Sequence, residues 1–188
     1  MLIQRRVALA LVLAFCSATA FTEETVKPAS PPPSPQVLDG LAPEAVMDLA
    51  NAWGMKNDEN KVNIWTTSRE FHFEFTNGTR TVIAMPTDRM VVSVAPYIMK
   101  THPCKEHFPS TCRGELANTP VEVKAVAEDG TVVLAEKTTT LPNGFVDLWL
   151  PRNLKIDVTL TARGLTATQR IGTFDKDKTC ITEAKLHY

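Results

Sequence analysis

The stretch KIDVTLTA, Lys155–Ala162, alternates polar and apolar side chains without a break. Ile156, Val158 and Leu160 fall on one face of an extended chain, and charged or hydroxyl-bearing residues fall on the other. This period of two predicts a half-buried antiparallel β-strand, because one face meets a core and the other meets water. The pair Arg163-Gly164 directly after it is a turn signal. The second half of the chain is therefore predicted to be β.

Similar short segments surround this strand from about residue 119 onward. Glu128-Asp129-Gly130 and Pro142-Asn143-Gly144 are turn sequences that separate them. Strands of this length and spacing predict an antiparallel β-sandwich, which we assign, with the loop before it, to residues 96–188. A unit of this size buries only a modest core, so a cross-link or a metal near its edge would help to stabilise it. The predicted strands cover 121–127, 131–136, 145–150, 155–162, 165–173 and 180–186.

A smaller unit with one helix is predicted before the sandwich, over residues 37–95. Pro43 suits the first turn of a helix, where its missing N–H is not needed, and Gly54 suits the end. The dipeptide Asn77-Gly78 predicts a tight hairpin. The fold class is thus mainly β (α+β), with a helix-plus-antiparallel-strand unit followed by an antiparallel β-sandwich. The strands predicted for the first unit cover 62–65, 71–75, 81–85 and 90–95.

The first 20 residues have the pattern of a cleaved secretory signal. Arg5 and Arg6 precede the apolar run Val7–Phe15, and Ala18-Thr19-Ala20 supplies a small-x-small cleavage site. The run is too short to span a bilayer, and no later segment approaches the required length of about 20 apolar residues. We therefore expect an exported protein that is not inserted in the membrane.

Charge and composition argue against several other classes of function. Without Arg5 and Arg6, 18 of the 20 basic residues remain against 21 acidic residues, a net charge of −3 that favours neither nucleic acid nor an anionic membrane as partner. Neither unit has a Gly-rich phosphate loop or a Ser/His/Asp spacing of known type.

Residues 21–36 are rich in proline and predict an extended tether ahead of the folded units.

The loop THPCKEHFPSTCRGE, Thr101–Glu115, contains the side chains best suited to chemistry. It contains two cysteines, Cys104 and Cys112, and two histidines, His102 and His107, together with two prolines. Thiols and imidazoles in such a loop indicate either metal chemistry or a disulfide. A disulfide would account for the two cysteines, but it would not explain why histidines flank Cys104 on both sides.

A third thiol lies far along the chain. Cys16 is lost with the signal, so the mature chain keeps Cys104, Cys112 and Cys180, an odd number for an exported protein. Cys180 begins the last predicted strand, which in a sandwich can lie beside the loop, so the three sulfurs could meet. Three thiolates suit Cu(I), whereas three thiolates with one histidine suit tetrahedral zinc. The spacing leaves both metals open, together with a disulfide- or zinc-stabilised exported β module that binds another protein.

The loop belongs to a longer pattern with a remote third cysteine, which is far more specific than a lone pair of cysteines. The pattern consists of Val94-Ala95-Pro96-Tyr97, Thr101-His102-Pro103-Cys104, His107, Ser110, Cys112, Gly114-Glu115 and Cys180. In these residues the chain resembles the CueP family of bacterial periplasmic copper-binding proteins. The similarity covers about residues 37–188, the whole mature chain beyond the tether.

The resemblance implies a periplasmic protein of copper homeostasis that binds copper through Cys104, Cys112 and Cys180, with His102 and His107 as accompanying residues of the motif. It also implies a role in copper resistance, supply of copper to a periplasmic superoxide dismutase, reduction of Cu(II) to Cu(I), and formation of a homodimer. No catalytic activity besides this thiol-dependent reduction is indicated. The expected cargo is Cu(I), with zinc as the alternative.

Overall fold

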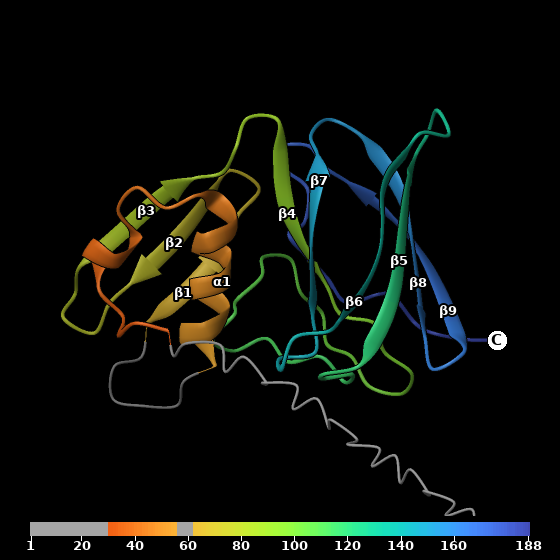
Figure 1. The fold of residues 1–188 in the computed structure, drawn as a ribbon, viewed down its shortest axis with the longest axis horizontal. Helices are drawn as coiled ribbons and strands as arrows, with labels where there is room; N and C mark the ends of the chain where they lie inside the picture. Colours follow the sequence, from red (N-terminus) through yellow and green to blue (C-terminus); the bar gives the residue numbers. More distant parts are fainter. Residues whose placement is uncertain (1–29, 56–61) are drawn as a thin grey trace, which may run out of the picture.

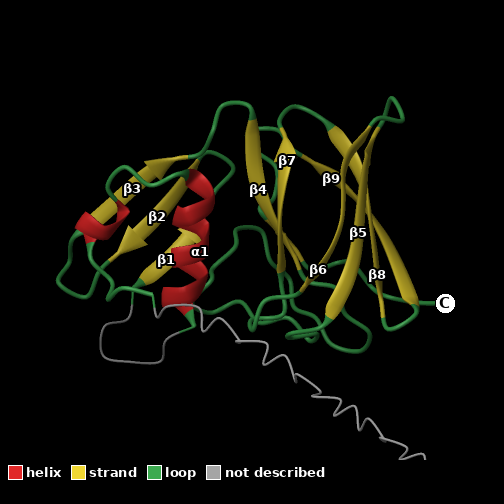
Figure 2. Cartoon of the chain, in the orientation of Figure 1, coloured by secondary structure: helices red, strands yellow, loops and turns green. Residues whose placement is uncertain are grey.

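The chain is mainly β, as its sequence predicts. A computed structural model describes residues 30–55 and 62–188, and among these it has ten strands, one α-helix and one short 3-10 helix, Pro35–Leu38. The predicted signal at 1–20 and the first part of the predicted tether lie outside the described residues. No helix in the described ranges is both long and apolar enough to cross a membrane. Figure 2 shows the distribution of helix, strand and loop.

The N-terminal part is a helix packed on a small antiparallel sheet, as predicted (Figure 1). The helix α1 starts at Pro43 and ends at Gly54, and its buried Trp53 meets the rings of Phe73 and Phe75 edge-on at 6.0 and 6.3 Å. Beneath it the sheet has the order β1-β2-β3 and contains the predicted Asn77-Gly78 turn. The three strands are β1 (Asn63–Thr66), β2 (Glu70–Glu74) and β3 (Arg80–Ala84).

Two further sheets face one another in the C-terminal part (Figure 1). One has the order β10-β4-β7 and the other has the order β6-β5-β8-β9. The strand β8 is the alternating stretch Lys155–Ala162, and its apolar side chains are buried as the pattern predicts. The remaining bounds are β4 (Arg89–Val94), β5 (Pro120–Ala127), β6 (Val132–Thr139), β7 (Val146–Pro151), β9 (Leu165–Gly172) and β10 (Cys180–Ile181).

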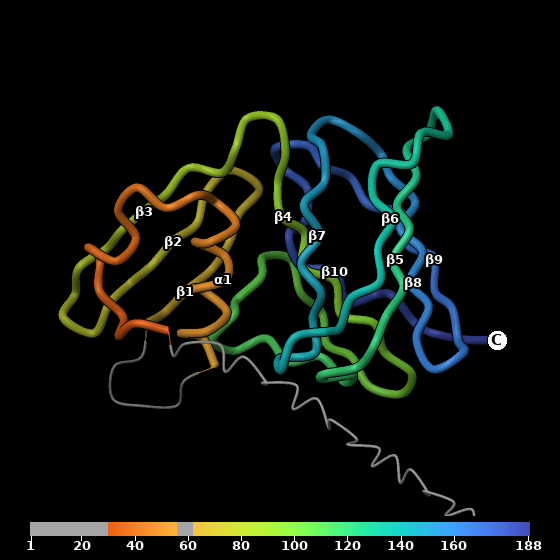
Figure 3. The backbone as a smooth tube through the Cα atoms, viewed as in Figure 1, coloured from red at the N-terminus to blue at the C-terminus, as the bar shows by residue number. Residues whose placement is uncertain are grey.

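The last strand differs from its predicted extent. It was expected over 180–186, but β10 covers only Cys180–Ile181 and runs parallel to β4 (Figure 3). Beyond it the chain leaves the sheet and makes isolated bridges, Tyr97 with Lys185 and Thr166 with His187. The range 37–95 predicted for the N-terminal unit includes β4, which pairs with β7 and β10. The strand β4 therefore leads from the N-terminal part into the sheet whose edge strand, β10, begins at Cys180.

Polar contacts fasten α1 to the sheet that holds β4 and β7. The amide of Asn51 donates to Asp147 at 2.6 Å, and the hydroxyl of Ser93 donates to the other oxygen of the same carboxylate at 2.5 Å. The indole N–H of Trp53 donates to the carbonyl of Pro31 at 2.9 Å, so the end of the Pro-rich segment packs on the helix. These contacts fix how the two parts meet, and the Cys/His loop lies at their junction.

Candidate metal centre

The loop Thr101–Glu115 connects β4 to β5 and is bonded to both parts of the molecule. The carbonyl of His107 accepts from the N–H of Thr66, at the end of β1, at 2.9 Å. Its own N–H donates to the Thr179 hydroxyl at 3.1 Å, and that hydroxyl donates to the Thr66 carbonyl at 2.7 Å. The N–H of Cys180 donates to the carbonyl of Lys105 at 3.2 Å. The loop is thereby placed between the small sheet and β10.

A tight turn inside the loop positions Cys112. Its N–H donates to the carbonyl of Phe108 at 2.8 Å. The guanidinium of Arg113 donates to three carbonyls of the same turn, those of Cys112 at 2.7 Å, Ser110 at 3.0 Å and Pro109 at 3.2 Å. Since one planar cation binds three backbone oxygens, the backbone around Cys112 has little freedom to shift.

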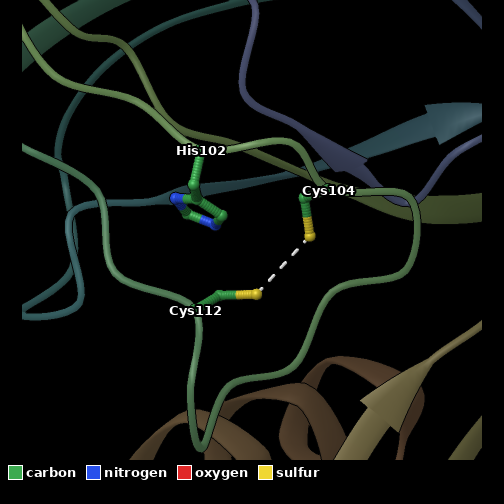
Figure 4. A group of neighbouring side chains, drawn as sticks. All are labelled: His102, Cys104 and Cys112. Atoms are coloured by element: carbon green, nitrogen blue, oxygen red, sulfur yellow. Dashed lines mark hydrogen bonds between the residues drawn. The ribbon is translucent and has the colours of Figure 1, made fainter.

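The three predicted cysteines are free thiols that come together at this junction. The sulfurs of Cys104 and Cys112 are 3.5 Å apart, whereas a disulfide requires about 2.05 Å. Figure 4 shows these two sulfurs and the ring of His102 directed toward the same space. The spacing is close to the roughly 3.8 Å expected of two sulfurs at about 2.3 Å from one tetrahedral ion.

All five predicted site residues fall into two overlapping groups. In each group the potential ligand atoms lie within 4.8 Å of one another. The outer group is His102, Cys104 and Cys112, and the inner group is His107, Cys112 and Cys180. Cys112 belongs to both. The sequence indicated that these residues could meet, but it did not indicate that they divide in this way.

The two groups differ in their access to solvent. His102 and Cys104 are half-buried, and both line a pocket of about 500 Å³ together with Cys112. His107 and Cys180 have no exposed surface and are not part of the pocket lining. Cys112 is 7% exposed and separates the pocket from the interior. An ion arriving from solvent therefore meets the outer group first.

His107 is a buried imidazole. Neither Nδ1 nor Nε2 makes a hydrogen bond of regular geometry with a described residue, although the ring is close enough to the Cys112 sulfur to help lower the pKa of that thiol. The ring lies against Phe145, with centroids 4.5 Å apart, and Phe145 was not identified from the sequence. Buried polar atoms in proteins almost always have a partner, because leaving one without costs about 1–3 kcal/mol. The unsatisfied nitrogens fit a metal ligand better than a structural histidine.

Cys112 is the most acidic of the three thiols. Hydrogen bonds with Cys104 and Cys180 lower the pKa of Cys112. The hydrogen bond with Cys112 raises the pKa of Cys104 to about 12. Hydrogen bonds with Cys104 and Cys112, together with burial, raise the pKa of Cys180. The main causes are the neighbouring thiols, and not the lysines and arginine that lie nearby in the sequence.

Glu115 holds the segment that leads into the site. One of its carboxylate oxygens accepts from the N–H groups of Ile98 and Met99 at 2.8 Å and of Lys100 at 3.0 Å. These bonds, that of Lys100 first, lower the pKa of Glu115. His102 follows this anchored segment by two residues, so Glu115 helps to set the position of the outer group.

We expect Glu115→Gln to loosen the segment Ile98–Lys100, because hydrogen bonds to a charged acceptor are about twice as strong as neutral ones. Amide hydrogen exchange of these three residues should become faster. The pKa of Glu115 is lowered in the folded state, so the anchor is complete above its ordinary value of 4.5 and is lost as pH falls through the lowered pKa. Glu106→Gln is the control, since that carboxylate accepts none of these bonds. Equal exchange in both variants would contradict the anchor.

Cysteine sulfurs and imidazole nitrogens gathered beside a pocket suit soft metal ions such as Cu(I), and also suit zinc. The fold and the site thus describe a mainly β protein with a thiolate-imidazole cluster able to hold a metal ion. Comparison with known proteins specifies the family. The family model of the periplasmic copper-binding protein CueP matches residues 51–185, and the chain belongs to the CueP family.

A solved structure supports this assignment. The chain is 30% identical to the protein in the crystal structure of S.CueP, with a TM-score of 0.74. The similarity covers 81% of this chain and 92% of the other. Among curated proteins no match was found. The family resemblance predicted from the loop is therefore confirmed, and the family is periplasmic and copper-binding.

Proposed function

We propose that this protein holds Cu(I) through the thiolates of Cys104, Cys112 and Cys180, with His102 and His107 as additional ligands. The observation that carries the proposal is the meeting of three free thiols with a buried imidazole whose two nitrogens make no regular hydrogen bond within 30–55 and 62–188. Thiolates favour Cu(I) over harder ions, and the family is copper-binding. Three thiolates with one imidazole would also suit zinc, which is the alternative cargo.

Burial of the ion and its release through the pocket fit a role in copper resistance and delivery. The interior position keeps Cu(I) away from peroxide, while His102 and Cys104 line a pocket that a ligand of an acceptor could reach. A periplasmic superoxide dismutase is the acceptor that the family resemblance suggests. We also propose that residues 1–20 are removed on export to the periplasm and that the protein forms a homodimer, again from the resemblance.

Reduction of Cu(II) is a second candidate activity, and the 3.5 Å separation of the Cys104 and Cys112 sulfurs favours it. Formation of one disulfide from these two thiols would release two electrons and two protons. The electrons would reduce two Cu(II) ions to Cu(I). Such a step would consume the sulfurs that bind the product, so it requires a separate thiol reductant before copper can be held again.

The test of Cu(I) binding uses Cys180, the ligand most distant from the loop in the sequence. We expect the reduced wild-type protein to take up one Cu(I) in competition with a chromogenic Cu(I) chelator. Loss of an outer-sphere partner at a metal site typically lowers the metal affinity by about 10- to 100-fold. Cys180→Ser removes a proposed ligand itself, so it should weaken the Cu(I) affinity by more than that. Serine is nearly isosteric but is a poor ligand for Cu(I).

Ser110→Ala provides the matched control in the same loop. Ser110 belongs to neither group of potential ligands, so removal of its hydroxyl should leave the Cu(I) affinity unchanged. Unaltered affinity in Cys180→Ser would exclude a role for the third thiolate. Zinc in protein isolated from its own compartment would favour the zinc alternative. A native disulfide without copper uptake after reduction would favour the protein-binding β module.

A further inference from the structure

The outer and inner groups share the sulfur of Cys112, so an ion could pass from one group to the other without leaving that sulfur. We infer that a single Cu(I) ion binds first to the outer group, His102, Cys104 and Cys112, and then passes to the inner group, where His107 and Cys180 replace His102 and Cys104 while Cys112 stays bound. This inference rests on the proposed binding of Cu(I) and refines it, because the three thiolates and two histidines then bind the ion as two successive sets of three ligands and not all at once. It assigns different roles to the two histidines, His102 in loading and His107 in retention.

Burial sets the direction of the transfer. The outer group lines the 500 Å³ pocket, so solvent and small ligands reach it. His107 and Cys180 have 0% exposure and do not line the pocket, whereas Cys112, whose thiol interacts with that of Cys180, does line it. A Cu(I) ion bound inside is shielded from water and peroxide, whereas one bound at the pocket is not. The inner group is therefore the resting position and the outer group is the point of exchange.

His107 supplies the independent reason to place an ion inside. Both of its ring nitrogens are buried and make no hydrogen bond of regular geometry with the residues that the structure describes, and one of them lies within 4.8 Å of the Cys112 and Cys180 sulfurs. A bound ion would satisfy one nitrogen and offset the cost of burying it. Its backbone is fixed by Thr66 and Thr179, so the ring is held in place before the ion arrives. His102 lines the pocket instead.

The shared thiolate makes the transfer short. All ligand atoms of each group lie within 4.8 Å of one another, so both positions are within bonding reach of the Cys112 sulfur. The ion never loses its bond to Cys112, which avoids the high cost of a free ion in a buried site. Cys180 gives up its thiol proton as it binds, and Cys104 takes up a proton as it leaves. No electron is transferred, and the net charge of the site is unchanged.

The experiment compares His102→Gln with His107→Gln and measures the rate of Cu(I) transfer separately from the Cu(I) affinity at equilibrium. Each protein is mixed with the Cu(I) bicinchoninate complex, and both the rate of transfer and the final distribution are measured. We expect His102→Gln to slow loading and release together by about 10-fold, while the affinity changes by less than about threefold. We expect His107→Gln to lower the affinity by about 10- to 100-fold and to speed release. X-ray absorption should show a nitrogen ligand in the loaded wild type and in His102→Gln.

Several results would overturn the inference. If His102→Gln lowers the affinity as much as it slows loading, His102 is a resting ligand and there is one position only. Uptake of two Cu(I) ions by the wild type would show that both groups are filled at once. Should His107→Gln not fold, judged by thermal unfolding of the metal-free protein, the rates and affinity of His102→Gln still decide. A wild type that takes up no Cu(I) would refute the proposed function as well, whereas normal uptake with equal effects of both variants would refute this inference alone.

Discussion

Cys112→Ser is expected to lower the Cu(I) affinity more than the corresponding change at Cys104 or Cys180. Cys112 is the only residue common to the outer and inner groups, so its loss leaves neither group with more than one sulfur. It is also the most acidic of the three thiols, because hydrogen bonds with Cys104 and Cys180 lower its pKa. We expect a loss of about 1,000-fold or more, equivalent to about 4 kcal/mol of binding free energy.

Chelator competition on the three single serine variants measures this order. The metal-free proteins should first be compared by thermal unfolding, since Cys112 is 7% exposed and Cys180 is fully buried. Ser110→Ala, two residues from Cys112, again controls for a general disturbance of the loop. An affinity for Cys112→Ser equal to that of Cys104→Ser would mean that the shared sulfur has no special role, and would contradict the overlap of the two groups.

The sequence was sufficient to predict the secondary structure where periodicity and turn residues agree. The alternation in Lys155–Ala162 became β8, Asn77-Gly78 became the turn between β2 and β3, and Pro43 and Gly54 bound α1. The meeting of Cys180 with the loop was also predicted, because a sandwich brings its last strand beside the loop that leads into it. These features depend on local pattern and on a common topology.

The division of the site into two groups could not be predicted, because it depends on contacts that are distant in sequence. His102 and His107 are five residues apart in a loop with no periodicity, so nothing local shows which ring is buried. Thr66 and Thr179 fix the backbone of His107, and Phe145 covers its ring. None of these three carries a signal in the sequence that links it to the loop.

A close approach of two glycines holds the end of the metal loop in place. Gly114 lies two residues after Cys112, and its N–H donates to the carbonyl of Asn143 at 2.6 Å. A Cβ atom on Gly144 would lie 2.5 Å from the carbonyl oxygen of Gly114 and 2.6 Å from its carbonyl carbon. Gly144 also has a φ of +84°, which L side chains rarely adopt. Backbone meets backbone here, so neither side can move away without shifting the loop.

Gly144→Ala should therefore destabilise the fold and weaken Cu(I) binding together. Gly130→Ala is the matched control, because Gly130 has a similar φ of +87° but nothing within 4 Å of its added Cβ. The control bears only the conformational cost of about 1–2 kcal/mol. Gly144→Ala adds the cost of overpacking, about 1–3 kcal/mol, and should lower Tm by about 10 °C. The displaced backbone is that of Gly114, two residues from Cys112. The Cu(I) affinity of Gly144→Ala should therefore fall, whereas that of Gly130→Ala should not. Equal Tm values for the two variants would show that the close approach does not constrain the loop.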